Sequence, residues 1–441
     1  MKNKLPQGWV ECELKNIAKE IISGSGFPKI YQGNKIGDYP FAKVGDISKL
    51  FRNKKKTIDS AENYINEDVK DKIKGKIFPA NTIVFPKIGE ALKGNYRLIT
   101  RKKMLFDNNV MGIVFSNNIN ILFLYYFLVT QDFGKFSVAT TIPSIQKGCI
   151  EGIKINLPPL NEQRRIVEKI EEEFGKIDEG VEKLRFALEQ IKQYRQAVLK
   201  SAFDGKLYKT TEWKEKILEE VTSYIQRGKS PKYCEEENNC FIINQKCIRW
   251  NNLQSEFKKF VTQDFWDSLS QERFLKAGDI LWNSTGTGTI GRAYLFRGDE
   301  LDSAIVDSHV TIVRVKKDNI LSEFLFYFVM SPFVQYKIEA MQSGSTNQVE
   351  LGRTEIKNTK INLPTIAEQQ QIVKEIEKRL KVADRIEAVI RQNLDKAEQL
   401  KQSILKKAFE GRLVPQDPND EPASVLLEKI KAERKNKCLI S

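Results

Sequence analysis

Residues 286–291 are the strongest candidate for cofactor chemistry. They read Gly-Thr-Gly-Thr-Ile-Gly, the G-x-G-x-x-G spacing of dinucleotide-binding turns, and they follow the apolar stretch 280–282. Such a site needs a helix directly after the glycines, because the helix N-terminus binds the pyrophosphate. Residues 292–298 are instead predicted as a second strand that closes a hairpin. We therefore interpret the segment as a glycine-rich hairpin and not as a nucleotide site.

The other residues with possible chemistry lack the partners that catalysis or metal binding requires. His309 is the only histidine, which excludes a His-based triad and an HExxH zinc site. Cys234, Cys240 and Cys247 are separated by five and six residues, wider than the spacing of a zinc knuckle. The Glu-x-Lys triplets at 256–258 and 355–357 resemble nuclease triplets but are commonplace in a chain that is 29% charged. The sequence predicts no catalytic residue, no metal site and no cofactor on this chain.

Composition favours a polyanionic partner such as nucleic acid. The chain has 441 residues and a formal net charge of +14, and residues 1–150 carry 24 Lys and Arg against 13 Asp and Glu. Residues 208–360 balance at 21 and 21. Six unevenly spaced cysteines suggest a reducing cytosol, and the longest apolar run, 121–129, is too short to span a bilayer. We therefore expect a cytoplasmic protein.

DNA contacts can be assigned by residue type, since phosphates are bound by Lys and Arg, and base edges by Arg, Lys, Asn, Gln, Ser and Thr. The glycine-rich hairpin would bring its backbone and Thr hydroxyls close to DNA. Candidates in the first half are Lys29, Lys35, Lys43, Lys87, Lys93, Arg97, Arg101, Lys102, Lys103, Thr140 and Thr141. Candidates in the second half are Arg227, Lys229, Lys232, Asn244, Gln245, Lys246, Arg249, Ser284, Thr287, Arg292, Asn347 and Gln348. Residues 54–56, three adjacent lysines, are predicted to form a solvated turn.

An internal repeat supplies the elements that must position these residues. Residues 155–207 and 361–413 align without a gap and share 21 identities in 53 positions. The repeat is too long for a solenoid unit, and it divides the chain into two similar halves. Each half has a variable globular segment followed by a shared helical one.

Both helical copies carry an apolar heptad stripe, which is typical of a helix that packs along another helix. A helix from Asn161, its expected N-cap, to Phe203 would be about 60 Å long. In the second copy, Thr365 and Glu368 have the spacing of a capping box. The predicted pairing residues are Phe174, Ile177, Val181, Leu184, Leu188, Ile191, Val198, Leu380, Ala383, Ile390, Leu394, Ala397 and Ile404.

Two further matches indicate that the helices are equivalent. Arg195 and Lys401 interrupt the stripe at the same level, and Gly205 and Gly411 are placed to end the helices. The alternative is a long amphipathic helix lying on its own domain. Heptads sustained in two matched copies favour two helices that pair with each other.

The globular segments match more loosely and are predicted to be mixed α/β domains. Apolar stretches broken by Gly, Asn and Asp indicate irregular strands. The aromatic runs at 123–127 and 325–329 predict one buried helix in each domain. The expected order is a first domain (1–154), a first helical spacer (155–207), a second domain (208–360), and a second spacer with a C-terminal tail (361–441). The tail helix expected at 424–437 is predicted to contact a partner subunit.

This order resembles the specificity subunit of type I DNA restriction–modification systems. The junctions Leu-Pro-Pro-Leu-Asn-Glu-Gln (157–163) and Leu-Pro-Thr-Ile-Ala-Glu-Gln (363–369) are similar to the family's junction. The openings at Gly8-Trp9 and Glu212-Trp213 and the tail at 413–423 are similar as well. The resemblance covers nearly the whole chain.

The resemblance implies a non-catalytic subunit that binds double-stranded DNA. Each globular target-recognition domain would read one half of a bipartite, asymmetric target, and two long antiparallel coiled-coil helices, related by a pseudo-two-fold, would separate the domains and set the spacer. Half-sites one DNA turn apart are about 34 Å apart, which such helices can span. Two methyltransferase subunits that bind S-adenosylmethionine would dock on the helices, and motor-nuclease subunits can join them. The alternatives are a coiled-coil assembly adaptor and a specificity subunit of a methylation-only or other phage-defence system.

Overall fold

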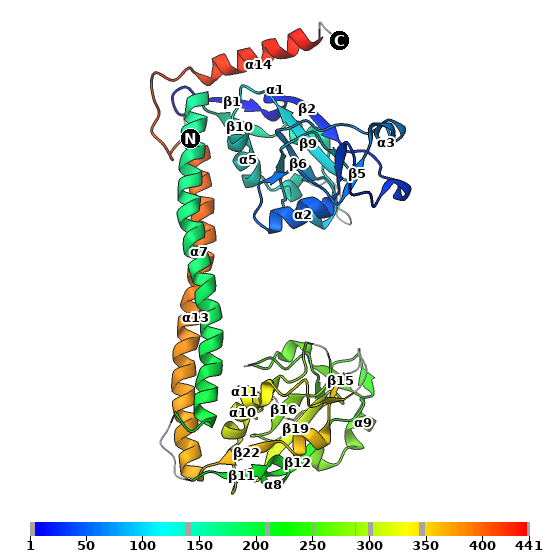
Figure 1. Cartoon of the computed structure of the whole chain (residues 1–441), viewed down its shortest axis with the longest axis vertical. Helices are drawn as coiled ribbons and strands as arrows, with labels where there is room; N and C mark the ends of the chain where they lie inside the picture. Colours follow the sequence, from blue (N-terminus) through cyan, green and yellow to red (C-terminus); the bar gives the residue numbers. More distant parts are fainter. Residues whose placement is uncertain are drawn as a thin grey trace. The chain divides into compact units, whose positions relative to one another are not determined.

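The chain folds into two compact units. The computed structural model describes residues 5–136, 143–207, 212–250, 252–286, 288–298, 303–343 and 349–438. One unit comprises residues 1–182 and 393–441, and the other comprises residues 183–392. Each unit contains one mixed α/β domain and parts of two 44-residue helices, α7 (Leu160–Phe203) and α13 (Ile366–Phe409) (Figure 1). The predicted mixed α/β class with two long helices is confirmed.

The first domain is built on a five-stranded sheet with the order β2-β9-β6-β7-β4. Its central strands β6 and β9 are almost wholly buried, which explains their nearly continuous apolar sequence. The strands of this domain are β1 (Val10–Glu13), β2 (Ala18–Ser23), β3 (Tyr39–Ala42), β4 (Thr57–Ile58), β5 (Asn63–Ile65), β6 (Thr82–Pro86), β7 (Leu98–Thr100), β8 (Leu105–Phe106), β9 (Val110–Phe115) and β10 (Lys154–Leu157). Its helices are α1 (Leu14–Ile17), η1 (Lys29–Tyr31), α2 (Val44–Arg52), α3 (Glu67–Lys72), α4 (Glu90–Lys93), α5 (Ile121–Thr130), η2 (Phe133–Phe136) and α6 (Lys147–Glu151).

The second domain repeats this plan with a shorter sheet, β12-β19-β16-β17. The antiparallel pair β11·β22 has the register of β1·β10, so both domains join their long helix in the same way. The strands are β11 (Lys214–Ile217), β12 (Thr222–Arg227), β13 (Tyr233–Cys234), β14 (Phe241–Ile243), β15 (Lys259–Val261), β16 (Ile280–Asn283), β17 (Ala293–Leu295), β18 (Ile305–Val306), β19 (Val310–Val315), β20 (Gln342–Ser343), β21 (Glu350–Leu351) and β22 (Lys360–Leu363). The helices are α8 (Leu218–Val221), η3 (Ser255–Phe257), α9 (Gln263–Asp267), η4 (Gln271–Arg273), α10 (Ser322–Met330), α11 (Pro332–Gln335) and α12 (Arg353–Lys357).

The aromatic runs form the buried helices α5 and α10, as predicted. α5 begins after Asn120, whose side chain accepts hydrogen bonds from the N–H groups of Leu122 and Phe123. The rings of Phe123 and Phe127 pack on Phe409, at the end of α13. In the second domain Phe324 and Phe328 pack on Phe203 in the same way. Each domain core is therefore closed by the end of the helix that belongs to the other repeat.

Helices α7 and α13 pair antiparallel within each unit. In the second unit the Arg195 guanidinium bonds to Asp384 at 2.6 Å and Glu387 at 2.9 Å, and in the first unit Lys401 Nζ bonds to Asp178 at 2.7 Å. Arg195 and Lys401 are repeat equivalents, and so are Asp384 and Asp178, so the same contact is made twice. All the predicted pairing residues are buried or half-buried, among them Val181, Ala383, Ile390 and Ile404.

The helix ends follow the sequence signals with one exception. Gly205 and Gly411 have positive φ (71° and 69°), the left-handed conformation that ends a helix. The Thr365 N–H donates to Glu368 Oε2 at 2.9 Å, which confirms the capping box. The prediction of Asn161 as an N-cap was wrong, because α7 begins at Leu160 and includes Asn161.

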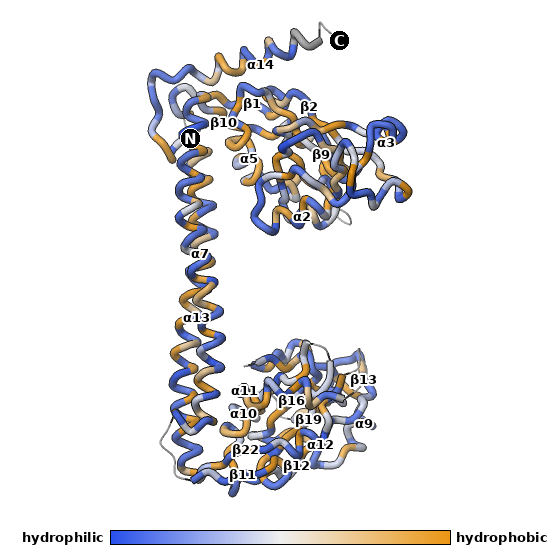
Figure 2. Tube along the Cα trace, viewed as in Figure 1, coloured by the Kyte–Doolittle hydropathy of each residue, from blue (hydrophilic) through white to orange (hydrophobic). Residues whose placement is uncertain are grey.

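The C-terminal helix α14 (Ala423–Cys438) packs on the first unit's own core. Ala423, Leu426, Leu427 and Ile430 are buried in the cluster that contains Leu14 and Ile17. Figure 2 shows hydrophobic residues along the inner strands and along alternate turns of the long helices. None of the described helices is long and apolar enough to cross a membrane.

We predict that enlarging Ala383, which is 1% exposed in the helical seam, destabilises the second unit. Ala383→Leu should lower the free energy of unfolding by about 1–3 kcal/mol, because extra methyl groups have no space in a close-packed seam. Urea unfolding followed by circular dichroism measures the change. Ala388→Leu, the same substitution at an exposed position of the same helix, is the control and should change it by less than about 0.5 kcal/mol. Equal changes in the free energy of unfolding for both variants would contradict the close packing of Ala383 in the helical seam.

Candidate nucleic-acid interface

In both domains the chain passes very close to another backbone segment just before the first candidate cations. We call this close approach the crossing. A Cβ on Gly24 would lie 1.9 Å from the carbonyl oxygen of Asp107, and one on Gly228 would lie 1.9 Å from that of Val306. Only glycine allows this approach. An aspartate, half-buried in the first domain and buried in the second, braces this approach: Asp107 Oδ1 accepts the N–H of Asn109 and Asp307 Oδ1 accepts that of His309, both at 2.9 Å. The chain that leaves each crossing carries exposed lysines.

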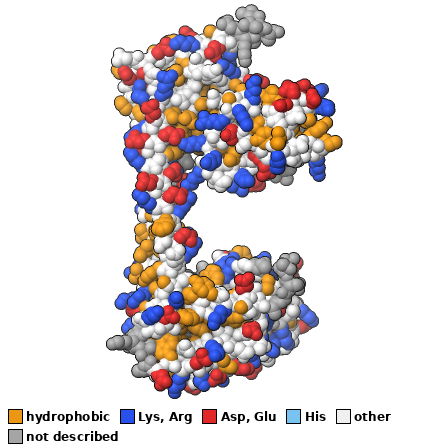
Figure 3. Space-filling view, in the orientation of Figure 1, with side chains coloured by type: hydrophobic (Ala, Val, Ile, Leu, Met, Phe, Trp, Pro, Cys, Tyr) orange, Lys and Arg blue, Asp and Glu red, His pale blue; other side chains and the backbone are white. Residues whose placement is uncertain are grey.

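The cations of the first domain are mostly exposed. Lys29, Lys35, Lys93 and the cluster 101–103 are exposed, whereas Lys43 and Lys87 are half-buried. The cluster 101–103 lies in the turn between β7 and β8. Lys35 and Lys93 are already engaged, with the Glu62 carbonyl and with the Glu90 carboxylate respectively. On the face seen in Figure 3, Lys and Arg side chains gather on this domain, while on the second domain they alternate with acidic and apolar ones.

The prediction that Arg97 contacts DNA is wrong. Its side chain is completely buried, and its guanidinium donates to the carbonyls of Asn95 and Gln131 at 2.5 and 2.6 Å. It also lies 3.9 Å from the centre of the Phe133 ring. Burial lowers the pKa of Arg97 to about 9. Arg97 therefore fixes the loop around α4 and η2 and is not available to DNA.

The glycine-rich hairpin of the second domain has the predicted hairpin structure. β17 pairs antiparallel with β16, and Gly286, Gly288 and Gly291 have φ between 86° and 90°, where other residues are strained. Gln245 holds the hairpin, since its side-chain Oε1 accepts the Thr289 hydroxyl at 3.1 Å and its backbone carbonyl accepts Asn283 Nδ2 at 3.0 Å. The glycines therefore hold a backbone conformation that brings the hairpin onto the 244–254 loop.

Spare hydrogen-bonding groups concentrate at this hairpin. Among the described residues, five buried side-chain atoms have no hydrogen-bond partner, and four of them lie between positions 282 and 292. They are Trp282 Nε1, Asn283 Oδ1, Thr285 Oγ1 and Arg292 Nε. Such groups are costly and concentrate at functional sites. The sequence analysis included Thr289 only through the expected Thr hydroxyls of the hairpin, and it missed Asn283 and Thr285; the signal was a run of polar residues directly after an apolar stretch.

Two arginines lie beside this hairpin. Arg292 Nη2 donates to the carbonyl of Gly288 at 2.6 Å, and Arg249, on the neighbouring loop, donates to Gln254 Oε1 at 2.5 Å. Burial, and then the nearby charge of Arg249, lowers the pKa of Arg292. Neither arginine has a carboxylate partner among the described residues. A phosphate is an anion that could neutralise both.

The remaining predicted residues of the second domain divide by burial. Lys229, Lys232 and Lys246 are exposed, and Arg227 is bound to Glu350 at 2.7 Å. The prediction of Asn244 and Ser284 as contacts was wrong, because both are buried: Asn244 Nδ2 donates to the Phe257 carbonyl, and the Ser284 hydroxyl bonds to Thr311. The residues that lie outside the described ranges are Thr140, Thr141, Thr287, Asn347 and Gln348.

The side chains that could do covalent chemistry are held in structural roles. His309 Nδ1 lies 3.3 Å from Asp307 Oδ2, in the crossing described above. Burial raises the pKa of Cys247 to about 11 and that of Cys12 to about 12, so both remain thiols at neutral pH. Among the described residues, no group of three or more His, Cys, Asp and Glu could hold a metal ion.

We predict opposite roles for Arg97 and Arg101 in stability. Arg97→Ala should lower the free energy of unfolding of the first unit by about 2–4 kcal/mol, because it leaves a cavity and two buried carbonyls without donors. Arg101→Ala, at an exposed position four residues away, should change it by less than about 0.5 kcal/mol. Thermal unfolding of the two variants measures this. A stable Arg97→Ala variant would contradict the assigned role.

Comparison with known proteins agrees with this arrangement. Residues 6–183 and 210–396 each match the family described as "Type I restriction modification DNA specificity domain". The EcoKI specificity subunit of Escherichia coli is 24% identical over 98% of this chain and 96% of its own length. The MjaVIII specificity subunit of Methanocaldococcus jannaschii is 27% identical over 85% of this chain and 93% of its own.

Solved structures share the fold. A chain from a study of complex assembly and conformational transition in the type I restriction–modification system superposes with a TM-score of 0.70 at 18% identity, covering 93% of this chain and all of that one. The HsdS subunit of Thermoanaerobacter tengcongensis gives a TM-score of 0.52 at 18% identity, with 93% and 99% coverage. With a family match that covers both halves and relatives that match over nearly their full length, the chain belongs to the family of type I restriction–modification DNA specificity subunits.

Proposed function

We propose that this chain is the non-catalytic DNA-recognition subunit of a type I restriction–modification complex, in which each globular domain reads one half of a split, asymmetric target. The observation that carries the proposal is the duplication of one domain plan on two helices that pair through repeat-equivalent contacts. Because the domains share their helix junctions but differ in their loops, the two half-sites can differ in sequence. The paired helices would set the number of base pairs between them.

Charge supports DNA as the ligand. The first domain presents the exposed cluster 101–103, and the second presents Arg249 and Arg292 beside unpaired hydrogen-bonding groups. Cations would bind the phosphates and fix position on the duplex, while polar groups of the hairpin that are not fully buried, such as Thr289 and Gln245, would read base edges. No covalent step is assigned to this chain.

Methylation would be supplied by partner subunits that dock on the helices. The helical part of the second unit exposes Phe186 (67%), Val389 (55%) and Ile386 (49%), which is unusual for a surface that stays in water. We propose that two methyltransferase subunits bind such surfaces, and that these partners hold S-adenosylmethionine. Motor-nuclease subunits would complete a restricting complex; without them the assembly would only methylate. The chain and its partners would act in the cytoplasm.

The first test is the DNA affinity of single-cation variants. Arg101→Ala and Arg292→Ala should each weaken binding to the cognate site about three- to tenfold and reduce the slope of log K against log salt by about 1, because each removes one phosphate contact. Lys200→Ala, an exposed position on α7, is the control. Fluorescence anisotropy at several salt concentrations measures both quantities. Unchanged slopes in both domains would contradict DNA contact at these residues.

The second test reads the target itself. Modified-base sequencing of host DNA, with and without this gene, should show loss of adenine methylation at one motif of two short blocks around a fixed gap. Exchanging residues 208–360 for the corresponding domain of a relative should change one block and leave the other block and the gap. Both blocks changing together would contradict one domain per half-site. A chain that binds partner subunits but no DNA would be a coiled-coil adaptor.

A further inference from the structure

The first domain covers the edge of its sheet with a short strand. β4 pairs parallel with β7, where the N–H groups of Ile99 and Arg101 donate to the carbonyls of Lys56 and Ile58, both at 2.9 Å. Lys56, expected in a solvated turn, instead reaches the helix α7. Its Nζ bonds to the Tyr126 hydroxyl at 2.7 Å and to Glu171 at 2.8 Å. β4 and Lys56 together therefore connect the sheet, the buried helix α5 and α7.

The second domain leaves the equivalent edge open. Ile99 in β7 pairs with Ile83 of β6, which also pairs with β9. Leu295 in β17 pairs with Ile280 of β16, which also pairs with β19. Ile99 and Leu295 therefore occupy equivalent places in their sheets. β17 is nevertheless the last strand of its sheet, and no described strand covers it. In the first domain α2 and β4 lie between β3 and β5, whereas the described residues between β14 and β15 contain only the short helix η3.

The backbone groups on this edge point outward. The Asn283 N–H donates to the Arg292 carbonyl, and the Phe296 N–H donates to the Asp279 carbonyl, both at 2.8 Å. Because antiparallel residues alternate between their two sides, Leu295 and Arg297 direct their N–H and C=O groups away from β16. They are the equivalents of Ile99 and Arg101, which bond to β4. β17 is buried, with Leu295 only 5% exposed, so a further strand would reach these unpaired backbone groups through the space beside them.

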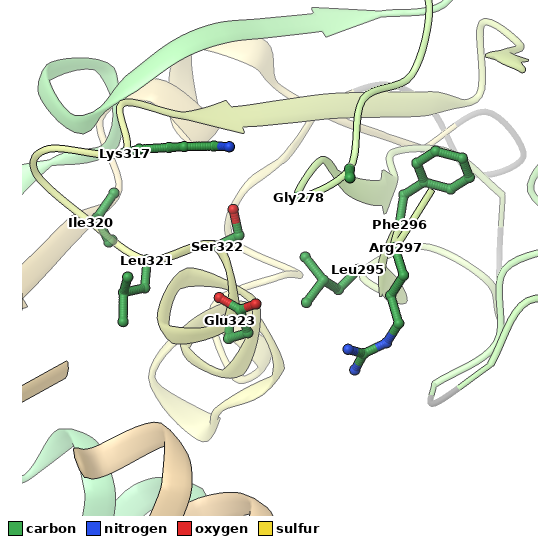
Figure 4. A pocket seen from close by; sticks show the side chains of 10 residues that line it. Gly278, Leu295, Phe296, Arg297, Lys317, Ile320, Leu321, Ser322 and Glu323 are labelled. Atoms are coloured by element: carbon green, nitrogen blue, oxygen red, sulfur yellow. The ribbon is translucent and has the colours of Figure 1, made fainter. Parts of the chain in front are cut away.

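Two cavities lie along the open edge. One, of about 380 Å³, lies at the end of the β16–β17 pair and is lined by residues 277–278 and 295–297, by Lys317 and by residues 320–323 (Figure 4). The other, of about 760 Å³, lies between this edge and the two long helices. Leu295 and Arg297 line both cavities. Both cavities therefore reach the two residues whose backbone groups are not paired with another strand.

The groups that bind Lys56 in the first unit are present here, but no lysine is bonded to them. Tyr327 and Glu377 are the equivalents of Tyr126 and Glu171, and both line the larger cavity. Burial, and then the charge of Glu377, raises the pKa of the Tyr327 hydroxyl. Asp384 is neutralised by Arg195, whereas the Glu377 carboxylate has no hydrogen bond or ion pair to another described residue. Arg297 and Lys381 also line this cavity, but neither forms an ion pair with Glu377, so the bonded cation of the first unit has no counterpart among the described residues.

We propose that the outer edge of β17 is a docking site for an extended, lysine-bearing segment of a partner subunit. The segment adds parallel to β17, bonds to the N–H groups of Leu295 and Arg297, and places its lysine between Tyr327 and Glu377. This inference rests on the proposed function, in which the chain assembles with methyltransferase subunits. It makes the two partner sites unequal, because the first unit supplies this strand and lysine itself through Lys56 and β4.

The test measures binding of the methyltransferase subunit by calorimetry, with DNA affinity measured alongside. Arg297→Pro removes an outward N–H without breaking the bonds to β16, and should weaken one of the two partner sites about tenfold, more than Arg297→Ala does. Glu377→Gln should weaken the same site to a similar extent. Glu171→Gln is the matched control, because its lysine comes from the same chain, and it should leave the affinity for the partner unchanged.

Hydrogen exchange on the wild-type complex gives a readout that needs no variant. The amides of Leu295 and Arg297 should become protected when the partner binds, while those of Ile99 and Arg101, already bonded to β4, should not change. A zero-length carbodiimide cross-link from Glu377 should capture a partner lysine. Equal affinities for all variants with no new protection would overturn the docking site and leave the proposed function standing. A wild-type chain that binds DNA but no methyltransferase subunit would overturn both the assembly and this site.

Discussion

The antiparallel packing of α7 against α13 is the constraint on which the rest of the molecule depends. Arg195 with Asp384 and Lys401 with Asp178 are one contact made twice, so the register of the pair is fixed in both units by the same geometry. A shift by one turn would break both ion pairs, even though the apolar stripe of each helix would still face its partner. The ends of the helices then enter the domain cores, where Phe409 and Phe203 pack on the aromatic helices. Neither domain core is complete without the helix of the other repeat.

The repeat keeps the junctions between domain and helix the same in both halves and allows the rest of each domain to differ. The strands beside the helix junctions keep the same register in both domains, whereas the elements farther from it differ. The first domain places α2 and β4 beyond β7, and the second has only the 244–254 loop there. Loops remote from the junction can therefore vary from one domain to the other, while the junction and the helical seam are retained. The difference at β4 is the exception, because Lys56 bonds to α7 itself.

The sequence predicted what depends on local pattern or on the repeat: the helical stripe, the glycine ends, the capping box, the aromatic helices and the hairpin. It failed where burial depends on residues far away in the chain. Arg97 has the composition of a phosphate contact, but its acceptor at Gln131 and its ring partner Phe133 are 34 and 36 residues away. Lys56 stands in a run of lysines, yet its carboxylate is 115 residues away. Ser284 was chosen by residue type, and only the sheet shows that its hydroxyl bonds to Thr311 inside the domain. Periodicity does not encode such partners.

The two domains also differ in how they would hold DNA. Residues 1–150 have 24 cations against 13 anions, a broad excess that attracts any duplex and is screened by salt. The second domain has no such excess, and instead concentrates unpaired polar atoms and two adjacent arginines at a hairpin stiffened by Gln245. Polar groups at such a hairpin gain from a ligand only if it supplies matching donors and acceptors at fixed positions, so those that reach the surface, such as Thr289 and Gln245, would contribute to discrimination more than to affinity. In one duplicated chain, the first domain would then supply much of the salt-dependent attraction, and the second would depend on that attraction to bring its hairpin to the correct bases.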